Sequence, residues 1–171
     1  GKIRRFQEKP PREEAYSNLI NAGTYILEPD IFKLMPDGAH SIERDVYEDL
    51  AEIGGLNGFP FEGWFVDAGT SASYIEAAQV CITNGRFSSG AVVGDSWFGD
   101  GSSNAGDVRG SAVGAGAEIG KGAAVRDSVI LKGARVGSGC RIEGCLIGMG
   151  ARIGDDQELS GEIVNHVLGT A

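Results

Sequence analysis

Two short polar motifs stand where predicted strands end and could bind a charged small molecule. The first is Glu8-Lys9-Pro10, directly after the apolar segment 2–6. A carboxylate there can accept hydrogen bonds from hydroxyl groups, an ammonium can meet a phosphate as a point charge, and proline fixes the direction of the pair. The alternative is an ion pair on a solvated surface, where such pairs contribute little.

The other candidates are one amide and one carboxylate. Asn21 interrupts the apolar segment 19–27, so it is either a core amide with satisfied hydrogen bonds or a ligand contact. Asp67 follows the aromatic run 63–66, and the carboxyl ends of strands are where open α/β sheets place ligands. Such a carboxylate could hold a hard cation such as Mg²⁺. Alternatively, Asp67 could serve as a second cap for the helix that Thr70 begins.

The elements that must position these residues are of mixed α/β type. Apolar runs predict strands over 2–6 and 19–27, and a strand or hairpin over 59–65. Residues 29–35 predict a helical turn, and Ser41 is a good N-cap for a helix with one apolar face. Thr70 predicts the start of another helix, which should run to Cys81. We therefore assign residues 1–85 to one domain.

The rest of the chain, residues 86–171, is a repeat. Aliphatic side chains recur at spacings of 6, 6 and 5, which add up to a unit of 17 residues, at Val113, Ile119, Val125, Ile130, Val136, Ile142, Ile147, Ile153, Leu159 and Val164. A small side chain stands two residues before nearly every one of them, and glycine follows several. A hexad has the wrong phase for an amphipathic helix and suits a coil of three short strands with glycine corners. The spacing predicts a parallel β-helix.

The repeat also explains two features that resemble functional motifs. The glycine clusters at 114–120 and 148–154 resemble dinucleotide loops, but they lie 34 residues apart, twice the repeat, and open no helix. We interpret them as solenoid corners. Cys140 and Cys145 occupy the small-residue position, which favours packing over a role as nucleophile or metal ligand.

Composition excludes some classes of protein. The 171 residues include 28 glycines, more than twice the usual ~7%, and the formal net charge is −9. This acid excess argues against nucleic-acid binding, which needs a basic surface. No apolar run approaches the ~18 residues of a membrane span, and no signal peptide opens the chain, so we expect no membrane partner. The odd count of three cysteines, without metal-ligand spacing, predicts reduced thiols in a cytoplasmic protein.

Four motifs in order resemble one enzyme family. They are FQEKP (6–10), NLINAGTYILEPDIF (18–32), SIERDVYEDLAEIGGLNGF (41–59) and FEGWFVDAGTSASYIEA (61–77), and hexapeptide coils follow them. Together they resemble the sugar-1-phosphate nucleotidyltransferases (NDP-sugar pyrophosphorylases). The segments around SIERDV and NAG are most similar to the mannose-1-phosphate guanylyltransferase branch.

The resemblance implies a fold, a reaction and residue roles. The implied fold is the C-terminal part of a Rossmann-like nucleotidyltransferase domain, followed by a left-handed parallel β-helix that would support a homo-oligomer. The implied reaction transfers a nucleotidyl group from an NTP to a sugar 1-phosphate with Mg²⁺ and releases pyrophosphate. By motif match, Glu8 would bind sugar hydroxyls, Lys9 would bind the sugar phosphate and act in catalysis, and Asn21 and Gly23 would line the sugar site. Asp67 would hold the metal.

One departure from the family pattern is large. The glycine-rich nucleotide loop of the family, of the type GxGTRLxPLT, does not occur in these residues. We therefore expect the chain to be the C-terminal half of an enzyme that makes GDP-mannose from GTP and mannose 1-phosphate, and to be inactive alone.

Three alternatives remain for the function. They are a non-catalytic regulatory or scaffold subunit, a pyrophosphorylase that uses glucose 1-phosphate with another NTP, and a hexapeptide acyltransferase. The acyltransferase is disfavoured because such enzymes need a positioned base, typically histidine, and residues 86–165 contain none.

Overall fold

The computed structural model describes residues 1–169, which form two compact units. The first unit is Gly1–Phe65 and the second begins at Val66. Residues 66–85, which the sequence analysis assigned to the first domain, therefore lie in the second unit. The domain boundary at residue 85 stays a prediction.

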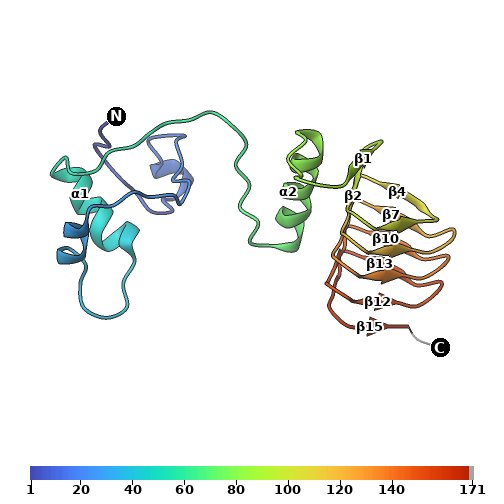
Figure 1. Ribbon diagram of the computed structural model, residues 1–171. Helices are drawn as coiled ribbons and strands as arrows, with labels where there is room; N and C mark the ends of the chain where they lie inside the picture. Colours follow the sequence, from blue (N-terminus) through green and yellow to red (C-terminus); the bar gives the residue numbers. More distant parts are fainter. Residues whose placement is uncertain (170–171) are drawn as a thin grey trace. The chain divides into compact units, whose positions relative to one another are not determined.

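The first unit consists of short helices joined by irregular segments (Figure 1). Its elements are η1 (Arg12–Glu14), η2 (Pro29–Lys33), the single π-turn η3 (Glu43–Tyr47) and α1 (Glu48–Glu52). A small core surrounds Tyr47, whose ring meets Phe6 edge-on at 5.7 Å and Tyr25 at 5.1 Å. Val46 and Ile31 are buried beside it. Aromatic contacts of this kind add to the burial that holds a small unit together.

Both helical predictions in this unit are confirmed. Residues 29–35 contain η2, and a helix does begin after Ser41. The backbone amide of Ser41 donates to the Asp45 carboxylate at 2.7 Å, and the amide of Asp45 donates to the carbonyl of Ser41 at 2.8 Å. These two bonds close the first turn.

The three predicted strands of this unit are wrong. Within residues 1–169, segments 19–27 and 59–65 form no strand, and segment 2–6 forms only an isolated antiparallel bridge between Lys2 and Asn57. A strand needs a partner for its backbone groups, and a lone extended segment has none. Most apolar side chains of segments 19–27 and 59–65 are consequently exposed, among them Ile26 and Phe59.

The second unit opens with α2 (Ser71–Thr83), which confirms the helix predicted to begin at Thr70. The Thr70 hydroxyl accepts from the amide of Ser73 at 3.1 Å, and the amide of Thr70 donates to the Ser73 hydroxyl at 3.0 Å. This reciprocal capping box satisfies two of the amides left free at a helix N-terminus. The helix ends two residues beyond the predicted Cys81.

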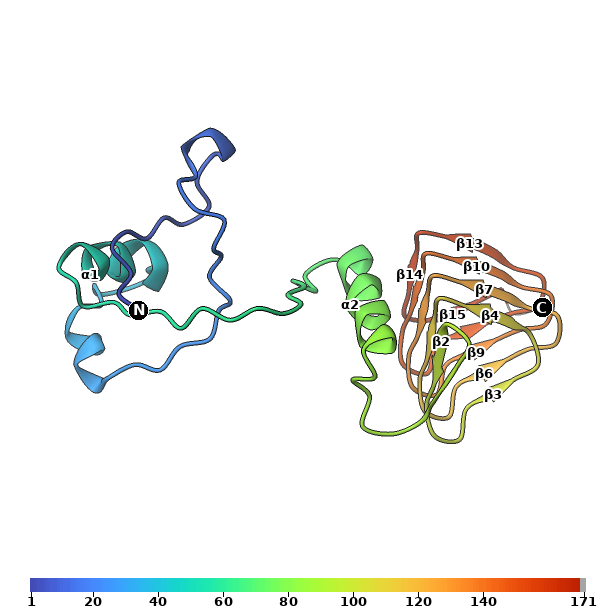
Figure 2. The same cartoon turned by 90° about the horizontal axis from the view of Figure 1, so that it is seen from above.

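A parallel β-solenoid follows, as predicted, and Figure 2 shows it nearly end-on, with one sheet along each side. The six-stranded sheet holds β1 (Ala91–Val93), β2 (Ser96–Phe98), β5 (Ala112–Val113), β8 (Val129–Ile130), β11 (Leu146–Ile147) and β14 (Ile163–Val164). The four-stranded sheet holds β4 (Asp107–Arg109), β7 (Ala124–Arg126), β10 (Arg141–Glu143) and β13 (Glu158–Ser160). The five-stranded sheet holds β3 (Ser103–Asn104), β6 (Glu118–Ile119), β9 (Arg135–Val136), β12 (Arg152–Ile153) and β15 (Val167–Leu168).

The predicted 17-residue register is confirmed. Val136 pairs with Ile119 in the preceding coil and with Ile153 in the next. All ten aliphatic residues singled out by the repeat are buried and form one continuous core. Because each coil packs on its neighbours, this core extends along the axis of the solenoid.

The small-residue positions between these aliphatics are buried too. Cys140 and Cys145 are fully enclosed, which confirms their interpretation as packing residues, and burial raises the pKa of the Cys140 thiol. Glycine is needed where coils approach closely: a Cβ at Gly120 would lie 2.5 Å from the backbone of Gly137. Across the described residues, no helix has the length and apolar character needed to cross a membrane.

Candidate functional site

The Glu8-Lys9-Pro10 motif borders a cavity in the first unit. The cavity is lined by Phe6, Glu8, Lys9, Pro10, Glu48 and Glu52, among others. The Lys9 ammonium lies 3.6 Å from the Glu8 carboxylate, and the Lys9 side chain is 83% exposed whereas that of Glu8 is 20% exposed. Lys9 adopts a φ of +49°, a conformation that costs a non-glycine residue free energy and is enriched at ligand sites.

Asn21 and Gly23 form a tight turn. The Asn21 side-chain oxygen accepts from the amide of Gly23 at 3.0 Å, and Gly23 has a φ of +68°. The Asn21 amide nitrogen donates to the Tyr25 hydroxyl at 2.6 Å. Asn21 is exposed, so the alternative of a buried core amide is wrong. The turn leaves open space beside Gly23, where a ligand could approach the backbone.

Tyr25 and Glu43 extend this cluster, and neither was among the candidates predicted from the sequence. The Tyr25 hydroxyl donates to Glu43 at 3.1 Å, and the second oxygen of Glu43 accepts from the Ser41 hydroxyl at 3.0 Å. The only signal in the sequence is the Ser-x-Glu spacing at the start of the predicted helix, which is weak. The hydrogen bonds therefore continue from Asn21 through Tyr25 to Glu43.

The charges of this unit act on one another. Hydrogen bonds from its own backbone amide and from the Ser41 hydroxyl lower the pKa of Glu43, and the Lys9 ammonium adds to this effect. Burial raises the pKa of Tyr25, and the negative charges of Glu43 and Glu8 contribute. At neutral pH Glu43 is a carboxylate and Tyr25 a neutral hydroxyl that donates to it. The charges of Glu8 and Lys9 therefore act through space on Tyr25 and Glu43 of this cluster.

This arrangement suits a small molecule that carries both hydroxyl groups and a negative charge. Two carboxylates, an amide and a phenol offer acceptors and donors for hydroxyl groups, and Lys9 supplies an exposed cation. Glu8 and Glu43 would repel a bare anion, so hydroxyl contacts have to contribute to binding.

Asp67 belongs to the second unit, whereas Glu8, Lys9, Asn21 and Gly23 belong to the first. It is exposed and lies three residues before the N-cap of α2. The cap is made by Thr70 and Ser73, and among the described residues no hydrogen bond joins Asp67 to the helix, so Asp67 is no second cap. Nowhere in residues 1–169 do three or more His, Cys, Asp or Glu side chains gather to hold a metal ion. Asp67 could therefore supply a single ligand.

Comparisons with known proteins find relatives for both parts of the chain. Residues 1–84 match the family model "Nucleotidyl transferase", and residues 71–164 match "GlmU-like, C-terminal hexapeptide". A UTP–glucose-1-phosphate uridylyltransferase of Pseudomonas aeruginosa is 38% identical over 85 residues, 47% of this chain and 30% of the relative.

Two mannose-1-phosphate guanyltransferases are also similar. That of Aspergillus fumigatus is 34% identical over 83 residues and that of Saccharomyces cerevisiae 34% over 82 residues, in each case 48% of this chain and 22% of the relative. The matched region thus spans less than a third of the length of these curated relatives. The chain belongs to the GlmU-like C-terminal hexapeptide family, and it joins these repeats to a segment of the nucleotidyl transferase family.

Proposed function

We propose that residues 1–67 supply the sugar-phosphate side of an enzyme that makes an NDP-sugar from an NTP and a sugar 1-phosphate. The observation that carries this proposal is the hydrogen-bonded cluster of Asn21, Tyr25 and Glu43, in the same unit as the exposed Lys9 cation and its Glu8 partner. Such a site matches a ligand with one phosphate and several hydroxyl groups. Two of the relatives named above act, by their names, on mannose 1-phosphate and one on glucose 1-phosphate.

Each residue has a proposed role in binding or orienting the substrate. Lys9 would meet the phosphate and act in catalysis by stabilising the negative charge that develops during transfer. Glu8 and Asn21 would bind hydroxyl groups of the sugar, and the backbone at Gly23 would allow close approach. Transfer of this kind requires positioned polar groups rather than covalent participation by the protein.

We also propose a role for Asp67 with Mg²⁺. This cation is usually held by one or two carboxylates together with substrate phosphates and water, and the single exposed carboxylate of Asp67 fits one such position. When bound, Mg²⁺ would neutralise charge on the reacting phosphates.

We further propose GDP-mannose as the product, with GTP and mannose 1-phosphate as substrates. In the second unit, the solenoid would provide the surface for assembly into a homo-oligomer. Because the printed sequence holds no glycine-rich loop of the GxGTRLxPLT type, we expect the 171-residue chain to make no nucleotide sugar by itself.

The test is an assay of pyrophosphate release. A full-length enzyme that carries these residues is incubated with mannose 1-phosphate or glucose 1-phosphate and with GTP, UTP, dTTP or ATP. Fastest release with mannose 1-phosphate and GTP supports the proposal, and faster release with glucose 1-phosphate contradicts the proposed product. No release with any pair contradicts the enzymatic function and favours a scaffold subunit. Formation of GDP-mannose by the 171-residue chain alone contradicts its proposed inactivity.

A further inference from the structure

One corner of the solenoid carries an aspartate where its equivalents in the other coils carry glycine. Between the four-stranded and the six-stranded sheets, the chain turns at positions 17 residues apart, each with a positive φ. Three of them are glycine, Gly110 at +58°, Gly144 at +61° and Gly161 at +69°, whereas Asp127 occupies the fourth at +43°. Glycine adopts this conformation without steric cost and aspartate does not. On backbone grounds alone glycine is favoured at position 127, so what the aspartate side chain contacts decides whether it has a role of its own.

The Asp127 side chain contacts α2. Its carboxylate accepts a hydrogen bond from the Gln79 amide nitrogen at 2.9 Å, and the same nitrogen donates to the carbonyl of Gly110 at 3.0 Å. Gly110 and Asp127 are equivalent corners of successive coils. Gln79 therefore joins one helix to two coils at once.

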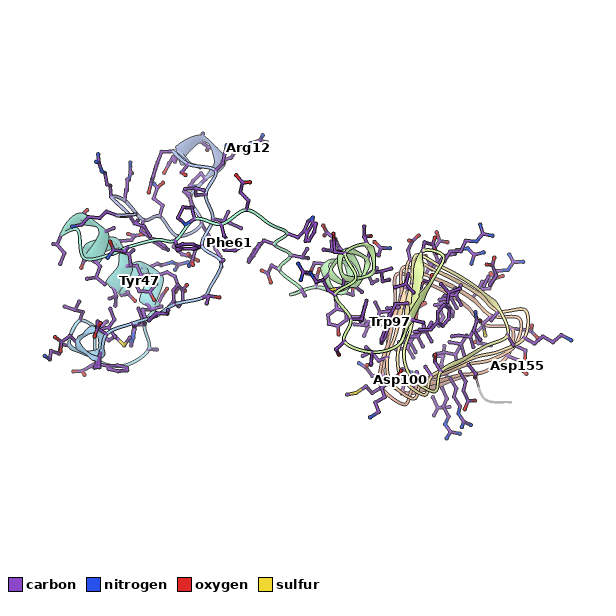
Figure 3. All side chains as sticks on the ribbon, turned by 45° about the horizontal axis from the view of Figure 1, so that its top comes forward. Arg12, Tyr47, Phe61, Trp97, Asp100 and Asp155 are labelled. Carbon is purple, nitrogen blue, oxygen red and sulfur yellow. The ribbon has the colours of Figure 1, made fainter. Side chains whose placement is uncertain are left out.

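Apolar contacts surround this polar one. Ile75 and Ile82 of α2 are buried against Ala112 and Val129 of the six-stranded sheet. Figure 3 shows Trp97 on the side of the solenoid that faces α2, and its ring stacks on Phe87 at 4.1 Å. Apolar packing is non-directional and leaves a helix some freedom to slide or rotate. The two hydrogen bonds of Gln79 have strict geometry and fix its position.

Helix α2 begins a few residues after Asp67, the proposed metal ligand. The capping box of Thr70 and Ser73 sets the start of α2, and Asp67 lies three residues earlier. In addition, the matches to the two family models overlap at residues 71–84, which contain α2. Restraint on α2 is therefore restraint on the segment that carries Asp67.

We propose that Gln79 and Asp127 are positioning residues that hold α2, and with it the Val66–Thr70 segment, on the solenoid. The solenoid then helps to position Asp67, a residue of the proposed site. For its functional meaning, this inference rests on the proposed role of Asp67.

The test is amide hydrogen exchange of the 171-residue chain, followed in peptides that cover residues 66–83. Asp127→Gly removes the carboxylate but also removes the unfavourable φ, so we expect the solenoid strands to exchange as slowly as before. We expect exchange over 66–83 to rise about five- to tenfold, as for loss of one hydrogen bond. Asp127→Asn keeps an acceptor and tolerates this φ, so it should restore protection.

Asp156→Gly is the matched control. Asp156 has a φ of +56° at a corner where the equivalents Gly122 and Gly139 are glycine, and in the described structure its side chain makes no hydrogen bond to α2. It should leave exchange over 66–83 unchanged. Unchanged exchange in Asp127→Gly, or an equal rise in both variants, would overturn the inference.

A separate measurement, the turnover of a full-length Asp67→Asn enzyme, tests the proposed function of Asp67. In the full-length enzyme, Asp67→Asn should lower turnover and weaken its dependence on Mg²⁺. If turnover is unaffected, Asp67 lacks its proposed role, yet the exchange result still decides whether Gln79 and Asp127 hold the helix.

Discussion

The backbone amide of Ser128 donates a 3.0 Å hydrogen bond to the hydroxyl of Ser111, its equivalent in the preceding coil. The pattern recurs along one corner: the amide of Ser111 donates to Ser96 at 3.2 Å, and that of Cys145 donates to Ser128 at 3.0 Å. The Ser128 hydroxyl in turn donates to the carbonyl of Arg126 at 2.6 Å. The buried hydroxyls of Ser111 and Ser128 thus each satisfy backbone groups of two coils.

Ser128→Ala should lower the free energy of unfolding by about 1–3 kcal/mol. The substitution leaves the carbonyl of Arg126 and the amide of Cys145 without these partners in a buried corner. Urea denaturation measures the change. Ser160→Ala, at an exposed strand end, is the control and should stay within about 0.5 kcal/mol. Equal effects of the two substitutions would contradict the role given to the hydroxyl.

Val136→Asp should cost several kcal/mol or unfold the coils. Val136 is buried between Ile119 and Ile153, and a carboxylate there would be charged with no partner. Lys132 is exposed at a corner, so Lys132→Asp should change stability by less than about 0.5 kcal/mol. Thermal melts compare the two variants. A loss for Lys132→Asp that matches or exceeds that for Val136→Asp would contradict the inward and outward assignments.

The solenoid should lose stability in acid through Asp107. Its carboxylate bonds Arg126 and, at 3.3 Å, Arg109, and these contacts lower the pKa of Asp107. Because the folded pKa lies below that of the unfolded chain, the contribution is present above the ordinary aspartate pKa of about 3.9. It is lost as pH falls from there through the folded pKa. In melts, Asp107→Asn should therefore be less stable than the wild type at pH 7, with a difference that shrinks at pH 3. A constant difference would mean that the charge of Asp107 does not contribute.

Lys9→Ala should lower kcat/KM of a full-length enzyme by a factor that corresponds to about 2–4 kcal/mol. This is the range for removal of one group directed at developing charge. Lys33→Ala is the matched control, because Lys33 is exposed in the same unit and pairs only with Asp30 among the described residues. Steady-state kinetics with sugar 1-phosphate distinguish the two variants, and wild-type kinetics in Lys9→Ala would refute the assignment.

The sequence alone was sufficient for the solenoid and for α2, and for a physical reason. Val136 pairs with residues 17 positions away, and ten aliphatic residues repeat that spacing, so each coil gives the same information. The start of α2 depends on Thr70 and Ser73, three residues apart, and local hydrogen bonds of this kind are visible in a sequence.

Other features depend on contacts between distant segments, and these were missed. Segments 19–27 and 59–65 have the composition of strands, but no residue in them identifies a partner strand, and none pairs with them in the described chain. In the candidate site, Glu8 and Lys9 followed from a motif. The Tyr25–Glu43 hydrogen bond joins residues 18 positions apart, and the Gln79–Asp127 bond spans 48. Neither spacing belongs to a repeat.

The antiparallel direction of β1 affects whether molecules of this protein can stack end to end through their solenoids. β1 runs antiparallel to β2, whereas the pairs between successive coils are parallel, and it adds one strand to a single side of the first coil (Figure 1). That end is therefore stepped by about 4.8 Å, the distance between neighbouring strands. The last coil of another molecule could not pair with all three sides of a stepped end at once. Exposed strand edges can pair with another molecule and so lead to fibres. A stepped end whose outermost strand runs antiparallel opposes such end-to-end growth.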